Sequence, residues 1–448
     1  MARETPSGSS SLTYHLEDIF ADLKVQLQLQ DDDRAKIDRL PGSKPLLHLL
    51  DEAARLVKTK QNLDEASTRV DAALDFIWEK LNTGYWKDVE MGWRIAYSHA
   101  SLLRTMTTCV NAIVVELESI RKALEACDRG LLMGAPIQDD LLTKVASRLN
   151  AFIRASETSE SKRYRLDEGD RNAEPASIGY QGKGSTLERI RVPSLHSFQT
   201  RYMNREQPII VEGAMTHWPA LRPAPNDRRW TLDYIKRVAG SRTVPVELGA
   251  RYTDETWGQS LITMNEFIDK YVAGGESVEK GYLAQHRLFD QIPELKRDIC
   301  IPDYCCISSS DDDVDVNAWF GPQGTVSPLH YDPKRNLLAQ VVGSKYVRLY
   351  EKSQTDFLYA HRSDMLKNTS QVDVECVDVA EHPLFCDAVY WDGVLKEGEM
   401  LYIPPMCWHF VKSLSVSFST TVFLCFSVDS ADSNFRCSNQ TATWVSPD

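Results

Sequence analysis

The stretch Asn317-Ala-Trp-Phe-Gly-Pro-Gln-Gly-Thr-Val-Ser-Pro-Leu-His-Tyr-Asp332 decides the fold of this chain. It predicts a strand, a Gly-Pro-Gln-Gly turn, and a second strand that ends at Asp332. In an extended chain, side chains two residues apart point to the same face, so His330 and Asp332 face one way and Tyr331 faces the other. An imidazole and a carboxylate on one face of a strand supply two ligands of a candidate metal site.

A third ligand is expected from a distant His on a neighbouring strand, and His409 is the best candidate. It lies in the segment Gly398-Glu-Met-Leu-Tyr-Ile-Pro-Pro-Met-Cys-Trp-His409. Two His and one carboxylate on one face of an octahedral metal leave the opposite positions open, which is the arrangement of non-haem Fe(II) oxygenases. A His-x-Asp pair alone often arises by chance. Together with the turn and the distant His, in this order, it is a strong signal.

Residues 336–350 lie between these segments and predict a β-hairpin with a Gly343-Ser344 turn. Lys345 opens the returning strand. A lysine that points into a barrel needs an anion, because an unpaired buried charge is costly. Lys345 is therefore a candidate partner for a dianionic cosubstrate.

Composition narrows the function classes. The chain has 448 residues, a net charge of −13 and 42% hydrophobic residues, which indicates a soluble protein with a substantial core. The acidic balance argues against a broad or sequence-specific nucleic-acid surface, and it favours basic partners such as ribosomal, chromatin-associated or histone-like peptides. The ten Cys form no Cys-x-x-Cys pair, and residues 1–12 do not resemble a secretory leader, so we expect a reduced intracellular compartment. No apolar run reaches membrane-spanning length.

Sequence patterning divides the chain into a helical half and a β-rich half. We expect a disordered start at 1–11, a helical interaction domain at 12–155, a linker at 156–187 and a catalytic barrel at 188–426. A polar tail follows at 427–448. In the helical half, apolar residues such as Leu46, Leu50 and Val57 recur at helical spacing. This predicts four to seven helices in a bundle or solenoid-like array, with no period that names a repeat family and no indication of its partner.

The fold class predicted for the whole chain is α+β. Short strands with Gly, Pro and Asp turns dominate the second half and indicate a double-sheet jelly-roll barrel with flanking helices. One of those helices is expected at 264–272 with Thr263 as its N-cap. The acidic segment 308–315 is expected to be a solvated loop.

At this point the chain resembles the JmjC-domain 2-oxoglutarate oxygenases, whose barrel is a cupin-like double-stranded β-helix. The resemblance covers roughly residues 190–423, and the helical half fits less closely. At the end, residues 427–448 depart from the family pattern, which closes with an aromatic-rich terminus. The likeness is carried by Gln207-Pro-Ile-Ile-Val, Tyr282-Leu-Ala-Gln-His, Asn317-Ala-Trp-Phe-Gly-Pro, Asn368-Thr-Ser-Gln-Val-Asp-Val-Glu375 and Ile403-Pro-Pro-Met-Cys-Trp408-His409.

The resemblance implies that His330, Asp332 and His409 are the catalytic metal ligands for Fe(II), and that O2 and 2-oxoglutarate are cosubstrates. The keto-acid end of 2-oxoglutarate would chelate the metal. Its far carboxylate would meet Lys345, with the help of Tyr282, Ser327 and Asn336. A buried carboxylate needs a cation and hydrogen-bond donors, and these four residues offer both.

For the substrate, the resemblance implies a basic side chain held beside the metal. Glu247 would pair with it, Tyr252 and Trp319 would form aromatic walls, and Gln285 would assist. The leading interpretation is hydroxylation of an arginyl residue in a basic protein. A nuclear location is also implied by the family, with the cytoplasm as the other possibility.

Three alternatives stay open. Demethylation of histone N-methyl-lysine uses the same centre. Cleavage of histone tails would need a nucleophile beside a base, and the sequence shows no such pair. A non-catalytic chromatin scaffold would not need the intact set of three ligands.

Overall fold

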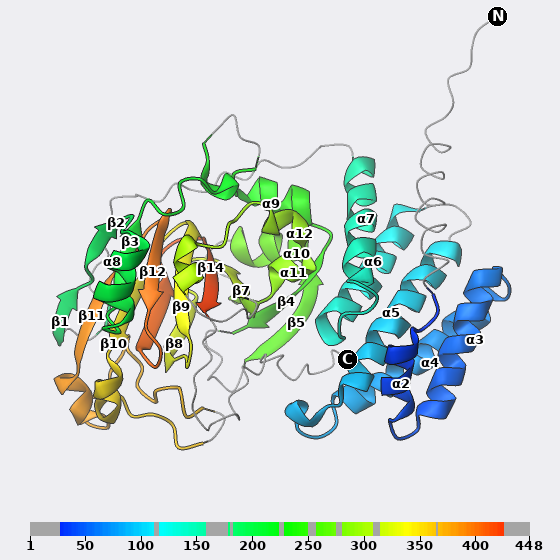
Figure 1. Ribbon diagram of the computed structural model, residues 1–448, viewed down its shortest axis with the longest axis horizontal. Coiled ribbons are helices and arrows are strands. Elements are labelled where there is room, and N and C mark those ends of the chain that lie inside the picture. Colours follow the sequence, from blue (N-terminus) through cyan, green and yellow to red (C-terminus); the bar gives the residue numbers. More distant parts are fainter. Residues whose placement is uncertain are drawn as a thin grey trace, which may run out of the picture.

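Figure 1 shows the computed structural model of the chain, which describes residues 27–111, 116–157, 178–179, 182–223, 228–249, 257–274, 280–307, 314–363 and 366–424. Several expectations fall outside these ranges: the disordered start at 1–11, most of the 156–187 linker, the acidic residues 308–313, the tail at 427–448 and Tyr252. They stay predictions.

The first half of the chain is a helical array, as the apolar spacing predicts. Each helix from α3 to α7 packs against the next along the chain, and together they bury one continuous apolar core. Gly130 allows α5 and α6 to approach closely, because a Cβ at this position would lie 2.6 Å from the Cβ of Ser101. The helices are α2 (Asp31–Asp38), α3 (Ser43–Thr59), α4 (Leu63–Leu81), α5 (Met91–Asn111), α6 (Leu117–Met133) and α7 (Leu141–Ser156), with a short 3-10 turn η1 (Trp86–Asp88).

The second half is a barrel of two facing sheets with flanking helices, which confirms the predicted α+β fold (Figure 1). The 5-stranded sheet has the order β1 (Lys183–Thr186), β11 (Val389–Leu395), β10 (Lys345–Tyr350), β13 (Trp408–Ser413), β8 (Val326–Tyr331). The 9-stranded sheet has the order β2 (Arg189–Arg191), β3 (Ile209–Glu212), β12 (Glu399–Ile403), β9 (Arg335–Val342), β14 (Ser417–Leu424), β7 (Asp315–Gly321), β6 (Gly281–His286), β4 (Thr243–Leu248), β5 (Gly258–Thr263).

The hairpin predicted at 336–350 is wrong. Both strands exist, but β9 lies in the 9-stranded sheet and β10 in the 5-stranded sheet, so the chain crosses the barrel between them. Gly343 makes the corner with φ +73°, and a Cβ there would come within 2.0 Å of the carbonyl oxygen of Val416. The boundary of the linker is also wrong, because residues 183–186 form β1, which pairs parallel to β11.

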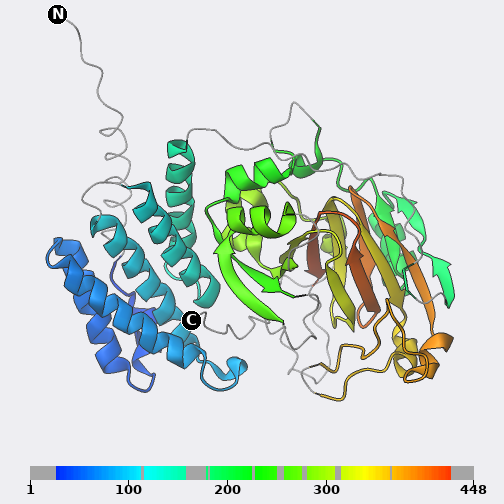
Figure 2. The same ribbon diagram turned by 180° about the vertical axis from the view of Figure 1, so that it is seen from behind.

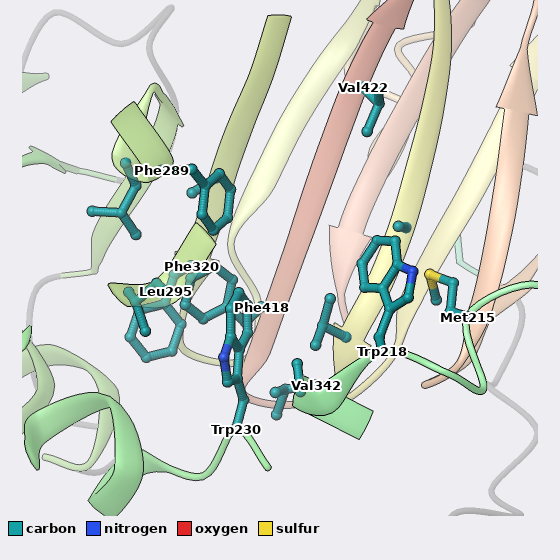
Figure 3. Packing of buried hydrophobic residues seen from close by; sticks show 14 of the residues in the cluster. Met215, Trp218, Trp230, Phe289, Leu295, Phe320, Val342, Phe418 and Val422 are labelled. Carbon is teal, nitrogen blue, oxygen red and sulfur yellow. The ribbon is translucent and has the colours of Figure 1, made fainter. Parts of the chain in front are cut away.

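Apolar layers lie on both sides of each sheet. Between the sheets, Leu338 and Leu401 of one sheet meet Val347 and Leu349 of the other. On the outer face of the 9-stranded sheet, aromatic rings pack against one another. The ring centroids of Trp230 and Phe418, for example, are 4.4 Å apart (Figure 3). These layers hold the strands in the register that brings the inward-facing polar side chains together.

Short helices cover that outer face. The N-cap predicted at Thr263 is present as part of a capping box: its hydroxyl accepts from the backbone N–H of Glu266, whose carboxylate accepts from the N–H of Thr263. The helices are α8 (Leu195–Phe198), α9 (Leu232–Ala239), α10 (Met264–Phe267), α11 (Leu288–Gln291) and α12 (Pro293–Lys296). The single turns are η2 (Gln199–Met203), η3 (Pro219–Leu221), η4 (Ile268–Val272), η5 (Asp303–Ile307), η6 (Lys352–Phe357) and η7 (Pro383–Asp387).

The two halves contact each other directly. Helix α6 packs against β4 and α11, and α7 packs against α9 and α12 (Figure 2). Within the described ranges, no helix combines the length and apolar character needed to cross a membrane.

Candidate metal centre

The three residues expected to bind a metal meet at one end of the barrel. His330 on β8 lies directly opposite His409 on β13 in the antiparallel register, so both imidazoles face the barrel interior. Their ring centroids are 4.2 Å apart. Asp332 follows β8, and its Oδ2 lies 3.7 Å from Nε2 of His409. One ligand atom from each residue lies within 4.8 Å of the other two.

Backbone hydrogen bonds fix the orientation of both imidazoles. Nδ1 of His330 donates to the carbonyl of Pro328 at 2.7 Å, and Nδ1 of His409 donates to the carbonyl of Cys407 at 3.0 Å. Each ring therefore keeps the lone pair of Nε2 for a metal, which is the usual supporting arrangement for metal-bound His. Burial and the neighbouring imidazole lower the pKa of His409 to about 4, so it is a neutral ligand at physiological pH.

The backbone of Asp332 is held as well, because the N–H of Met406 donates to its carbonyl at 2.8 Å. This bond ties the end of β8 to the turn that leads into β13. The donor set fits Fe(II): two neutral nitrogens and one carboxylate occupy one face of an octahedron and leave the other face open.

Lys345 lies inside the barrel, on the same face of β10 as Val347 and Leu349, and is 2% exposed. Its Nζ donates to the hydroxyl of Tyr282 at 3.3 Å. Among the described residues, no carboxylate lies within ion-pair distance of this ammonium, and burial lowers its pKa to about 7. A buried cation without a counter-ion is the feature expected of an anion-binding pocket.

The other residues expected around the cosubstrate have polar groups that suit this pocket. Tyr282 shares a hydrogen bond with Ser327, which connects β6 to β8, and burial raises the pKa of the Tyr282 hydroxyl. Asn336 is 3% exposed, and its Oδ1 has no hydrogen-bond partner among the described residues. The residues present therefore fit a small dicarboxylate.

The residues expected to contact substrate lie on the extension of the 9-stranded sheet. Glu247 on β4 pairs in register with Tyr282 on β6. Burial raises the pKa of Glu247 to about 7, and its Oε2 accepts a 3.3 Å hydrogen bond from the indole of Trp257. Trp257 was not predicted from the sequence, because nothing in its local pattern distinguishes it from a core tryptophan.

Trp319 and Gln285 occupy different environments. The ring of Trp319 lies 6.0 Å from that of Tyr282, and its indole donates to the hydroxyl of Thr421 at 3.0 Å. Gln285 is exposed and has φ +44°, in the left-handed region. The structure thus groups Glu247 and Trp319 around Tyr282, which contacts Lys345, and places Gln285 at the end of β6.

Comparisons with known proteins agree with this geometry. Residues 195–429 match the family described as a cupin-like domain, and residues 54–163 match KDM8-like N-terminal ARM repeats. The chain is 45% identical over 362 residues to lysine-specific demethylase 8 of Danio rerio, covering 80% of this chain and 87% of that protein. The chain belongs to the JmjC oxygenase family. The matched helical repeats are the solenoid that sequence periodicity did not name.

Other members of the JmjC oxygenase family align over similar lengths. Lysine-specific demethylase JMJ30 of Arabidopsis thaliana is 38% identical over 390 residues, covering 81% of this chain and 87% of that protein. Jumonji C domain-containing protein 5 of Drosophila melanogaster is 35% identical over 376 residues, covering 80% and 86%. Enzymes with this domain use Fe(II) and 2-oxoglutarate, which matches the donor set and the cationic pocket described above.

Proposed function

We propose that this JmjC oxygenase acts on a basic side chain of a protein and that its reaction is demethylation of N-methyl-lysine. The relatives named lysine-specific demethylases support this reaction better than the arginyl hydroxylation that the sequence favoured. The single structural observation that carries the proposal is the set of three ligands in a barrel that also buries Lys345, an ammonium with no carboxylate at ion-pair distance among the described residues. We further propose that the substrate is histone-like and that the enzyme acts in the nucleus.

In this reaction the residues of the chain bind and orient the metal, the 2-oxoglutarate and the substrate. His330, Asp332 and His409 would hold Fe(II), which together with 2-oxoglutarate and O2 supplies oxidation of a nearby C–H bond. Lys345 and the Tyr282 hydroxyl would bind the far carboxylate of 2-oxoglutarate, so that its keto-acid end lies toward the ligand set. Oxidation of an N-methyl carbon gives an unstable N-hydroxymethyl group, which leaves as formaldehyde, while 2-oxoglutarate is converted to succinate and CO2.

Glu247 would hold the cationic end of the substrate. Glu247 is half-buried, and its carboxylate receives a hydrogen bond from Trp257. A buried carboxylate is stabilised by a cation with N–H donors, and such a charge-assisted bond contributes about 1.5–3 kcal/mol. A partly methylated lysine ammonium and an arginine guanidinium both have these features.

Arginyl hydroxylation is the second candidate, and the neighbourhood of Glu247 favours it. A guanidinium pairs with a carboxylate through two parallel N–H groups and stacks on aromatic faces. Trp257 donates to Glu247, and Trp319 lies beside Tyr282 on the next strands, so a planar cation would meet a carboxylate and aromatic surface together.

Peptidase activity receives no support from the described residues. The thiols of Cys109, Cys127 and Cys407 are buried, and burial raises their pKa well above the ordinary value. A thiol with a raised pKa is a poor nucleophile at neutral pH.

The test supplies the purified protein with Fe(II), ascorbate and 2-oxoglutarate and offers matched peptides that contain methylated lysine or arginine. We expect formaldehyde in step with succinate and loss of a methyl group by mass spectrometry. Addition of one oxygen to an arginine peptide without formaldehyde would replace the first candidate with the second. If neither product forms on any peptide, and succinate forms at the same rate with and without peptide, both candidates are contradicted. Asp332→Ala is the control for the centre.

A further inference from the structure

The helical domain reaches into the catalytic domain through one buried carboxylate. Asp128 on α6 and Arg242, immediately before β4, are both completely buried. The guanidinium of Arg242 donates from Nε to both oxygens of Asp128 at 3.0 and 3.1 Å, and from Nη2 to Oδ1 at 2.6 Å. The two domains are therefore joined by a hydrogen-bonded ion pair that is completely buried.

Asp128 also receives hydrogen bonds from two further groups of the catalytic domain. The backbone N–H of Thr243, the first residue of β4, donates to Oδ2 at 2.8 Å. Nε2 of Gln291 on α11 donates to Oδ1 at 2.9 Å. A buried carboxylate with this many donors holds them in one arrangement, because a donor left unpaired in the interior is costly. Asp128 thus fixes the start of β4 and the end of α11.

Gln291 extends the network to β6. Its Nε2 also donates to the carbonyl of Thr243 at 2.7 Å, and its backbone carbonyl accepts from Arg242 at 2.9 Å. Because Nε2 of Gln291 is used in this way, Oε1 of the same side chain accepts a hydrogen bond from Nε2–H of His286 at 2.7 Å. Burial lowers the pKa of His286 to about 4, so the ring is neutral and donates through the proton on Nε2. His286 belongs to the Tyr-Leu-Ala-Gln-His motif, and the metal centre does not use it.

His286 anchors a β-bulge. Between the pairs Leu283↔Phe320 and His286↔Ala318, β6 advances three residues while β7 advances two. The inserted residue leaves Gln285 at φ +44°, a conformation that non-glycine residues adopt only when their surroundings hold it. Bulges of this kind re-aim side chains near active sites.

The two strands held by this network carry the residues assigned to substrate: Glu247 on β4 and Gln285 on β6. His330, His409 and Lys345 lie on the opposite sheet, on β8, β13 and β10, and Asp332 directly follows β8. We propose that Asp128 is a positioning residue for the substrate side of the catalytic centre, which makes the helical domain a part of the enzyme's substrate-binding structure. The assignment of Glu247 and Gln285 to substrate rests on the proposed function; the coupling of Asp128 to β4 and β6 does not.

Three variants of the full-length protein test this. Asp128→Asn removes the charge. Gln291→Met keeps the Asp128–Arg242 ion pair but removes the link to His286. Asn150→Leu is the control, because Asn150 on α7 makes a separate interdomain hydrogen bond, to the carbonyl of Val238 at 2.8 Å, outside this network.

The first measurement is backbone hydrogen exchange, which needs no substrate. In Asp128→Asn and Gln291→Met we expect faster exchange in β4 and β6, while β8, β10 and β13 and the affinity for Mn(II) stay as in the wild type. In Asn150→Leu, β4 and β6 exchange as in the wild type. Faster exchange confined to α6 and α7, or spread equally over both sheets, would overturn the proposal.

The second measurement is turnover of whichever peptide is active in the assay above. Both network variants should raise KM for the peptide on the order of tenfold, with kcat at saturating peptide changed much less, because the defect lies in placing the substrate. A fall in kcat at unchanged KM would contradict the positioning role. If no peptide is turned over, the proposed function fails, and the hydrogen-exchange result still decides whether the helical domain holds β4 and β6.

Discussion

Replacing Lys345 by Met should make the metal-free protein more stable and its binding of 2-oxoglutarate much weaker. Lys345 is 2% exposed, its Nζ lies 3.3 Å from the Tyr282 hydroxyl, and no carboxylate lies within ion-pair distance of it among the described residues. The methionine side chain has nearly the same length and can fill this position without a charge. Opposite effects on stability and on binding are the signature of a residue kept for a ligand.

The size of the stability effect follows from the pKa of Lys345. Burial lowers this pKa from 10.5 to about 7, so the unfolded chain binds the proton more readily than the folded one. The free energy of unfolding must then rise with pH between about 7 and 10.5, and the ammonium costs the folded state its full amount below pH 7. At about 1.4 kcal/mol per pH unit, the cost near pH 7 is roughly 4 kcal/mol.

The size of the binding effect follows from the loss of one partner of a buried charge pair. Such a truncation costs about 2–5 kcal/mol, which weakens binding from about thirtyfold to several thousandfold. In the wild type, affinity for 2-oxoglutarate should also fall as pH rises above about 7, because binding requires the ammonium form. In Lys345→Met this pH dependence should disappear.

Two assays check these values. Chemical denaturation of the metal-free proteins between pH 6 and 10 gives the stability difference, and calorimetric titration of the Mn(II) forms with 2-oxoglutarate gives the affinities. A Met variant that is less stable than the wild type at pH 7 and binds 2-oxoglutarate equally well would refute the reasoning, because Lys345 would then be paired or solvated.

Three further predictions concern the barrel and the substrate side. Gly343→Ala should cost more than about 2 kcal/mol of unfolding free energy, since it combines positive φ with a Cβ 2.0 Å from the Val416 carbonyl. The control Gly398→Ala, at φ +85° with nothing within 4 Å of its Cβ, should cost only about 1–2 kcal/mol in the same denaturation assay. Equal losses in the two variants would contradict the clash at Gly343. Asp298→Ala should cost about 3–5 kcal/mol, because its buried carboxylate accepts from Arg228, Trp230 and Tyr234; a thermal melt unchanged from the wild type would count against this. Glu247→Gln should raise KM for a basic peptide about tenfold to a hundredfold and leave the affinity for 2-oxoglutarate unchanged. In the wild type, peptide affinity should fall below pH 7, because this carboxylate, with its pKa of about 7, takes up a proton there. An unchanged KM in the variant would show that Glu247 does not belong to the substrate site.

The candidate metal centre could be located from sequence because its signal is local. The i, i+2 spacing of His330 and Asp332 fixes their common face once the segment is a strand. The partner His409 was identified by its segment, and the register that sets it opposite His330 is visible only in the structure.

The pairing of β9 and β10 could not be read in the same way. Two apolar runs around Gly343-Ser344 predict a hairpin when neighbours in sequence are taken as neighbours in the sheet. In this barrel the chain passes from one sheet to the other at that turn, and the true partners of β9 are β12 and β14, about sixty to ninety residues further along. Nothing within the segment distinguishes the two outcomes.

The contact between Asp128 and Arg242 lies beyond sequence reasoning for a related reason. Each residue alone has the character of an ordinary charged surface position, and they are separated by 114 residues. Only the packing of α6 against β4 shows that both are buried and paired. Long-range polar contacts of this kind depend on the relative position of two domains, which no local pattern encodes.

The most direct test of the metal centre is an anaerobic titration of the purified protein with Fe(II) in the presence of 2-oxoglutarate, followed by visible absorption. Chelation of a single ferrous ion by 2-oxoglutarate gives a charge-transfer band. We predict that this band grows to saturation at one equivalent of Fe(II) and is absent in Asp332→Ala, in which the ligand set is incomplete. A band of equal intensity in Asp332→Ala, or no band in the wild type, would contradict the assignment of His330, Asp332 and His409 as the metal ligands.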